Sequence, residues 1–209
     1  MLNKSQSRQA AVQPSLSSNE LEELQELQIS TTQVFKGRLA EVYSDQIRLP
    51  DGSESSREYL KHPGATAVLP IFDNGDIILL RQYRYPVGRV LWELPAGKLG
   101  TDENPLACGI RELREETGLT ADSWQPLFSY HPCIGYSDEV IHIFLATGLH
   151  TGQVNLDQGE FLTSHRITAT EVPHMLQIGE VIDGKTLIAL QWLLQRYNTP
   201  GIRSLLKEI

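Results

Sequence analysis

The sequence predicts a layered α/β fold. Its 209 residues suit one medium-sized domain with a small appendage. Runs rich in β-branched and aromatic residues alternate with segments in which apolar residues recur at helical spacing. Strands and helices that share one core are expected to stack in layers, with helices covering a sheet.

Composition narrows the classes of function. The formal net charge of −8 disfavours general nucleic-acid binding, which usually relies on a basic patch. The polar N-terminus lacks the apolar core of a secretory signal, and no apolar run is long enough to span a bilayer. The two cysteines, Cys108 and Cys133, lack metal-site spacing. We therefore expect a soluble cytoplasmic protein with neither a membrane nor a nucleic-acid partner.

The first part of the chain divides into a tail and a small sheet. Residues 1–28 are predicted to be a flexible tail with a possible short helix at 19–28, and residues 29–62 a small β-domain. Strand-like stretches lie around Val34–Phe35, Leu39–Tyr43 and Ile47–Leu49, before a turn at 50–52. Such a three-stranded antiparallel sheet is marginal alone, so it is expected to pack against something.

Residues 63–209 are predicted to form the main domain. Segment 64–88 is expected to be two strands joined by a hairpin at Asp73-Asn74-Gly75, because Asn-Gly between apolar runs favours a tight turn. Segment 140–149 is expected to be a buried strand, and 168–179 a short helix. A stronger helix is predicted at 183–197, with one apolar side formed by Leu187, Leu190, Leu194 and Tyr197.

Segment 105–117 is predicted to be a helix with clear ends. Asn104 suits the N-cap, Pro105 the first helical position and Gly118 the left-handed C-terminal position. On a helical wheel, one side carries the residues expected to face the core: Leu106, Ile110, Leu113 and Thr117.

The opposite side of this helix gathers Glu112, Glu115 and Glu116. Like charges at this spacing destabilise a helix, so either solvent or a bound cation must offset them. The preceding segment, ELPAGKLG, is rich in glycine and proline and can bend so that its carbonyls face the carboxylates. Carboxylate and carbonyl oxygens are hard ligands suited to Mg²⁺ or Mn²⁺.

Residues 97–119 resemble the signature of the Nudix hydrolases. All nine constrained positions match: Gly97, Glu103, Arg111, Glu112, Leu113, Glu115, Glu116, Gly118 and Leu119. Further stretches between about 34 and 195, including HPGATAVLP and GYSDEVIHIFLA, resemble the bacterial ADP-ribose pyrophosphatase branch. The resemblance implies an α/β/α sandwich around a mixed sheet, Mg²⁺-dependent cleavage of ADP-ribose, and a homodimer built through the N-terminal β-domain.

The resemblance also implies roles for individual residues. Metal ligands would be Glu112, Glu115, Glu116 and the Ala96 carbonyl. Arg111 and Glu103 would orient the carboxylates without touching substrate. The general base would be Glu160, with Glu115 or Glu116 as rivals.

Substrate contacts are implied at positions outside the signature. Arg84 is the candidate for a phosphate contact in preference to Arg81, and Arg57 and Glu58 for the adenine. Asp138 and Glu139 would support a loop over the terminal ribose. Tyr83, Tyr85 and Tyr136 are further candidates for stacking on the base. Ile134 replaces a proline that is usual in the branch, which makes FAD or another nucleotide conjugate a credible alternative substrate.

Two other classes of function compete with this interpretation. Residues 179–186 match the P-loop pattern, but the segment before them reads as a helix where a P-loop needs a strand. A non-catalytic ADP-ribose sensor is the second alternative. Such sensors tend to lose carboxylates of the signature, which this sequence retains in full.

Overall fold

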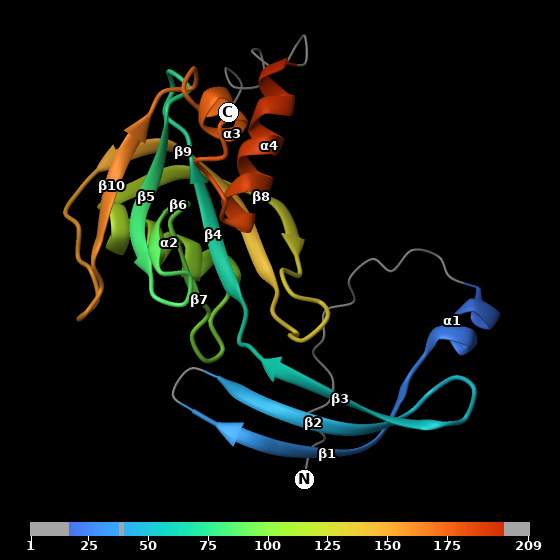
Figure 1. Cartoon of the computed structure of the whole chain (residues 1–209). Helices are drawn as coiled ribbons and strands as arrows, with labels where there is room; N and C mark the ends of the chain where they lie inside the picture. Colours follow the sequence, from blue (N-terminus) through green and yellow to red (C-terminus); the bar gives the residue numbers. More distant parts are fainter. Residues whose placement is uncertain (1–16, 38–39, 199–209) are drawn as a thin grey trace. The chain divides into compact units, whose positions relative to one another are not determined.

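The structure is a computed structural model that describes residues 17–37 and 40–198 (Figure 1). Contacts divide the chain into two compact units, Met1–Lys61 and His62–Ile209. Residues 1–16 of the flexible tail predicted for residues 1–28 lie outside the described residues. Each unit has its own sheet structure and is considered separately below.

The N-terminal unit contains one short helix and a three-stranded antiparallel sheet. Helix α1 (Ser18–Leu24) begins with a capping box, in which Ser17 and Glu20 bond to each other's backbone N–H groups. The sheet has the order β1-β2-β3, with bounds Leu27–Lys36, Glu41–Arg48 and Glu54–Lys61.

The three strands differ from the three predicted. The second and third predicted stretches lie in the single strand β2, apart from Leu39, which is outside the described residues, and Leu49, which follows β2. The polar centre of β2 does not interrupt it, because the buried Asp45 accepts a hydrogen bond of 2.6 Å from Gln28 Nε2. The third strand is β3, whose polar sequence ESSREYLK gives little apolar signal.

The C-terminal unit contains two sheets. One has the order β7-β4-β9-β8 and is mixed, since β4 and β9 run parallel while its other pairs are antiparallel. The other is antiparallel, with the order β10-β5-β6. The bounds are β4 Ala65–Pro70, β5 Ile77–Arg84, β6 Arg89–Glu93, β7 Ala96–Lys98, β8 Leu119–Tyr130, β9 Ile141–Thr151 and β10 Leu162–Ile167.

The hairpin predicted between β4 and β5 is wrong as a strand pairing. The turn forms as expected, with Gly75 at φ 89° and Phe72 N–H donating to the Asp76 carbonyl at 2.8 Å. However, only an isolated bridge from Ile71 to Ile77 joins the two segments, and β4 and β5 belong to different sheets. Both edges of β4 are already taken by β7 and β9, so β5 pairs with β6 and β10 instead.

Helices cover the sheets on two sides, as predicted for an α/β/α sandwich (Figure 1). Ala67 and Leu69 of β4 belong to the core cluster that includes α3 (Val172–Gln177) and α4 (Gly184–Asn198). Val68 between them belongs to a second cluster with Leu113 of α2 (Pro105–Thr117). The alternating side chains of β4 therefore serve both layers.

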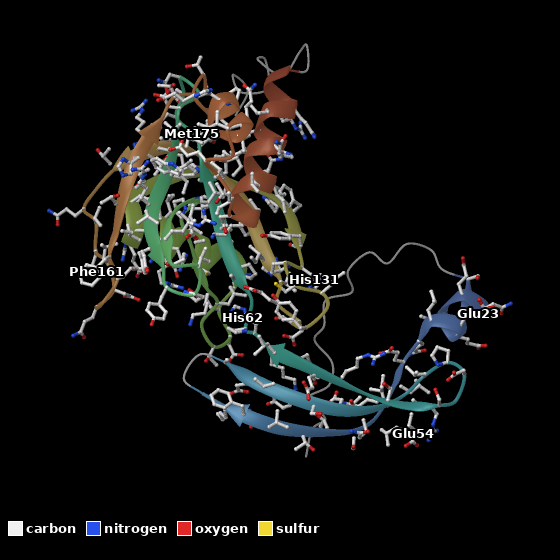
Figure 2. The ribbon with its side chains drawn as sticks, viewed as in Figure 1. Glu23, Glu54, His62, His131, Phe161 and Met175 are labelled. Carbon is white, nitrogen blue, oxygen red and sulfur yellow. The ribbon has the colours of Figure 1, made fainter. Side chains whose placement is uncertain are left out.

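The helix predicted at 183–197 is confirmed as α4, and that predicted at 168–179 as the shorter α3. Leu190 is fully buried, and Leu187 and Leu194 pack partly buried against the same core, while the Tyr197 side chain lies outside the described residues. Met175 of α3 also lies in this core (Figure 2). No helix within 17–37 and 40–198 is long and apolar enough to cross a membrane.

Candidate active site

Helix α2 forms between the predicted caps. The Leu106 N–H donates to the Asn104 side chain at 2.9 Å. At the other end, Gly118 adopts φ 71° and its N–H donates to the Arg114 carbonyl at 2.9 Å. These two ends set where the helix begins and stops. They place Glu112, Glu115 and Glu116 in its last two turns.

The buried face of α2 agrees with the prediction at Leu113, while Leu106 and Thr117 are half-buried and the prediction for Ile110 is wrong. Ile110 is 45% exposed, whereas Cys108, Gly109, Leu113 and Glu116 are buried. A Cβ at Gly109 would lie 3.0 Å from Thr66 Cγ2 on β4, so the missing side chain lets the helix lie close to the sheet. The prediction from the helical wheel considered only apolar side chains. It therefore missed the close contact of Gly109 with β4.

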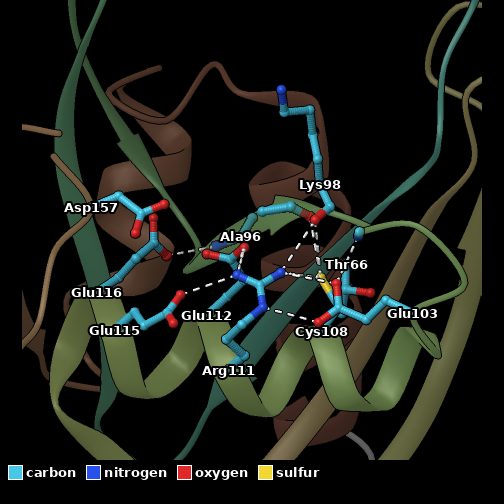
Figure 3. A network of polar contacts seen from close by, with 12 residues as sticks. Thr66, Ala96, Lys98, Glu103, Cys108, Arg111, Glu112, Glu115, Glu116 and Asp157 are labelled. Carbon is cyan, nitrogen blue, oxygen red and sulfur yellow. Dashed lines mark hydrogen bonds and ion pairs between the residues drawn. The ribbon is translucent and has the colours of Figure 1, made fainter. Parts of the chain in front are cut away.

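Arg111 holds three carboxylates together (Figure 3). Its Nε and Nη2 donate to the two oxygens of Glu103 at 2.9 and 3.0 Å. Its Nη1 donates to Glu112 at 2.6 Å and to Glu115 at 3.1 Å. The hydrogen bonds from Arg111, with one from the Gly100 N–H, lower the pKa of Glu103 to about 2. This geometry matches the orienting roles implied for Arg111 and Glu103.

Glu116 lies on the other side of this cluster, where it is 3% exposed. It accepts a hydrogen bond of 2.8 Å from the Ala96 N–H of β7. Burial is the main cause that raises its pKa to about 8. The Ala96 hydrogen bond opposes this shift, and the nearby charges of Glu112 and Glu160 add to it. Burial also raises the pKa of Glu112. The cluster therefore holds more negative charge than Arg111 offsets.

The donor atoms at this cluster fit a hard divalent cation. They are carboxylate oxygens, beside the backbone of Ala96 and Gly97 in β7. A Cβ at Gly97 would lie 1.8 Å from Glu112 Oε1, so the strand backbone abuts the carboxylate. Across the described ranges no group of three or more His, Cys, Asp or Glu side chains forms a preformed metal site. The glutamates are instead bonded to Arg111 and Ala96, so a cation would have to draw them together.

The loop before β10 brings Glu160 to the cluster. The Asn155 N–H donates to the Glu115 carbonyl at 3.0 Å, which ties the loop to the end of α2. The negative charge of Glu160 contributes to the raised pKa values of Glu112 and Glu116, so this carboxylate lies close to both. Its neighbour Phe161 is 84% exposed (Figure 2).

Arg84 and Arg81 of β5 have different surroundings. Arg84 donates from Nε and Nη2 to the two oxygens of Glu93 at 2.6 and 2.7 Å, and its charge also acts on Glu116. Arg81 stacks over the Trp92 ring at 4.1 Å and pairs with Glu180. Of the two arginines, only Arg84 is therefore connected to the carboxylate cluster.

Asp138 and Glu139 meet at the start of β4. Asp138 accepts a bond of 2.9 Å from the His62 N–H, and Glu139 lies 3.4 Å from His62 Nδ1. Glu139 also lines a cavity of about 420 Å³. The other residues that line it include Tyr130, His131, Asp183 and Lys185. Apart from its place in the P-loop-like match, no pattern in the sequence indicated that Lys185 lies beside Glu139 and Asp183 at this cavity.

The remaining predicted contacts are two residues of the N-terminal unit and three exposed tyrosines. Arg57 and Glu58 lie on β3 of the N-terminal unit, where Arg57 pairs with Glu26. The tyrosines proposed to stack on the base, Tyr83, Tyr85 and Tyr136, are all more than half exposed.

The sequence was compared with known families and proteins. The NUDIX domain model matches residues 61–188. The chain belongs to the NUDIX family. Nudix hydrolases generally need a divalent metal ion, in keeping with the carboxylate cluster on α2.

The matches between this Nudix hydrolase and individual relatives extend over nearly the whole length of each relative. An ADP-ribose pyrophosphatase of Bacillus subtilis is 38% identical over 175 residues, which is 83% of this chain and 95% of the relative. A methanol dehydrogenase activator of Bacillus methanolicus is 37% identical, over 81% of this chain and 92% of its own. A solved structure described as an ADP compounds hydrolase superposes with a TM-score of 0.73 at 22% identity, covering 83% of this chain and 95% of that one. This last match confirms the fold.

Proposed function

We propose that this Nudix enzyme hydrolyses ADP-ribose to AMP and ribose 5-phosphate with Mg²⁺ as its metal. The observation that carries the proposal is the excess negative charge at α2. Glu116 is buried and Glu112 is half-buried, burial raises the pKa of both, and both lie next to Glu115 and Glu160. A divalent cation shared with a diphosphate would neutralise this charge.

The residues have separable tasks in this reaction. Glu112, Glu115, Glu116 and the Ala96 carbonyl would hold the metal, which when bound offsets phosphate charge and makes a water molecule more acidic. Arg111 fixes the carboxylates through its three ion pairs. Glu160 would take the proton from the attacking water, and Glu115 or Glu116 is the rival for that role.

Phosphate and ribose contacts complete the assignment. Arg84 would contact the diphosphate, because its guanidinium is partly exposed and linked electrostatically to Glu116. Asp138 and Glu139 would support the loop over the terminal ribose through their contacts with His62. Arg57 and Glu58 of the N-terminal unit are proposed to contact the adenine.

The choice of ADP-ribose is supported by the name of the Bacillus subtilis relative. FAD is the second candidate, because Ile134 replaces a proline that is usual in the branch that this chain resembles. Ile134 is 84% exposed. We place the reaction in the cytoplasm, where the free thiols of Cys108 and Cys133 would stay reduced.

A product assay tests the proposal. The purified protein with Mg²⁺ is offered ADP-ribose, FAD, NADH and dinucleoside polyphosphates, and products are separated by chromatography. We expect AMP and ribose 5-phosphate from ADP-ribose at the highest kcat/KM, and no turnover when a chelator removes the metal. Preference for FAD would reassign the substrate, whereas tight ADP-ribose binding without turnover in Mg²⁺ would favour a sensor.

A further inference from the structure

A buried carboxylate, Glu93, is shared by two cations next to the site. Its side chain is 4% exposed and lies at the end of β6, three residues before Ala96. One oxygen accepts from Arg84 Nε at 2.6 Å. The other accepts from Arg84 Nη2 at 2.7 Å and from Lys185 Nζ at 2.5 Å. None of the roles proposed above requires Lys185 as a second cation beside Glu93.

Lys185 is held in an unfavourable place. It lies in the first turn of α4, where the helix dipole disfavours a positive charge, and its side chain is only 11% exposed. Asp183 offsets part of this cost, because it lies 3.1 Å from Lys185 Nζ. A buried ion pair is seldom the most stable choice for a core, so its retention here calls for another role.

The first turn of α4 is also fastened to the strand that carries Glu93. Asp183 accepts hydrogen bonds from the Thr186 N–H at 3.1 Å and hydroxyl at 2.6 Å. The Thr186 oxygen in turn accepts from the Leu94 N–H at 2.8 Å. The bond between Thr186 and Leu94, the residues that follow Lys185 and Glu93, therefore holds these two charged residues in place relative to each other. This arrangement also accounts for the lysine and threonine of the P-loop-like match, because both bond to protein groups. The match is preceded by the helix α3, where a P-loop needs a strand.

Exposure separates the three charged groups. The side chains of Glu93 and Lys185 are 4% and 11% exposed, whereas that of Arg84 is 41% exposed. Of the two cations, Arg84 is the more exposed, and it is the one proposed to contact the substrate phosphate. With Lys185 present, the lysine offsets the negative charge of Glu93. The positive charge of Arg84 is then not fully offset by Glu93 and is available for the contact with the substrate phosphate. Without Lys185, Glu93 would depend on Arg84 alone and would hold it back from the phosphate.

We propose that Lys185 is a positioning residue, which acts through Glu93 to set the place and the free charge of the Arg84 guanidinium that contacts the substrate's diphosphate. This inference rests on the proposed function, because it takes a diphosphate-containing nucleotide as the substrate. It adds a part of the chain, the first turn of α4, that the signature of the family does not include.

A double-mutant cycle tests the inference. Wild type, Lys185→Met, Arg84→Gln and the double variant are compared for kcat and KM with ADP-ribose and Mg²⁺. We expect Lys185→Met alone to raise KM by about tenfold, with a smaller change in kcat. In the Arg84→Gln background the same change should have almost no further effect, because its route to the substrate has been removed. Lys185→Arg, which keeps the charge, should recover most of the loss.

Arg81→Met is the matched control, since Arg81 lies on the same strand but stacks on Trp92. It should leave KM unchanged. Thermal unfolding of each variant shows whether the fold persists, and a destabilised Lys185→Met is replaced in the cycle by Lys185→Gln. Effects of Lys185 and Arg84 that simply add, or an unchanged KM in Lys185→Met, would overturn the inference. A wild type that prefers FAD contradicts only the proposed substrate, and the same four proteins then test Lys185 with FAD.

Discussion

Glu116 is a carboxylate whose surroundings disfavour its own charge. In the metal-free protein its pKa is raised to about 8, chiefly by burial, against an ordinary value of 4.5. The folded state therefore binds a proton that the unfolded state releases, between about pH 4.5 and pH 8. This group lowers the free energy of unfolding as the pH rises through that window. Binding of a divalent cation should remove the penalty, because the cation favours the charged form.

The variant Glu116→Gln should therefore have two opposite effects. Hydrolysis should fall by about 10³-fold or more, because a metal ligand that supports several kcal/mol of transition-state stabilisation is lost. The metal-free variant should nevertheless unfold at a higher temperature than wild type at pH 8, with the difference shrinking toward pH 4.5. Calorimetry with and without Mg²⁺ measures this. Asp122→Asn, an exposed site on β8, is the control, and near-normal activity in Glu116→Gln would contradict the metal assignment.

Glu160 has a different expected signature, since it is proposed to move a proton and not to hold the metal. Glu160→Gln should lower kcat by about 10²- to 10⁴-fold while the Mg²⁺ concentration for half-maximal activity stays nearly unchanged. Asp157→Asn in the same loop is the matched control and should have a small effect. If Glu115→Gln instead shows the larger loss of kcat with unchanged metal dependence, the base is Glu115.

At the scale of one element, α2 shows what a sequence can and cannot specify. Its bounds followed from Asn104, Pro105 and Gly118, because each acts through its own backbone geometry. Its buried face did not follow, because Gly109 brings the helix onto β4 by having no side chain. The same limit applies to β4 and β5, where the turn was local and predictable but the pairing depended on strands far away in the sequence.

The contact between β7 and α2 gives a prediction about the same element. A Cβ at Gly97 would overlap the Glu112 carboxylate, which is flexible and can swing away. Gly97→Ala should therefore leave the unfolding temperature almost unchanged but displace a metal ligand. We expect the Mg²⁺ requirement to rise by about 10- to 100-fold. Gly135→Ala has open space around its Cβ and serves as the control. A large loss of stability in Gly97→Ala would show that the backbone, and not Glu112, gives way.

At the scale of the whole molecule, the sequence predicted the residues of the carboxylate cluster better than the residues around the cluster that hold them in place. The signature located Arg111 together with Glu112 and Glu115, because these residues bond to one another within one helix. Glu93 and Lys185 are 92 residues apart and meet only in the folded chain. Their pairing has no local pattern, so it could be found only from the structure.

The N-terminal unit leaves apolar side chains on its edge strand β1 without cover. Leu27, Ile29, Val34 and Phe35 are each more than 45% exposed within the described residues. A three-stranded sheet of this size is marginal alone, and an exposed apolar edge invites association. We therefore predict a homodimer in which a second copy covers β1, with a mass in solution of twice the chain's 23.5 kDa.

Val34→Lys should shift the protein toward the monomer in sedimentation velocity, because burying the new charge in the interface is costly. Thr32→Lys, on the same strand but without loss of an apolar side chain, should leave more of the dimer intact. A wild type that sediments as a monomer at micromolar concentration would contradict this assignment, and a Val34→Lys dimer as strong as wild type would move the interface away from β1.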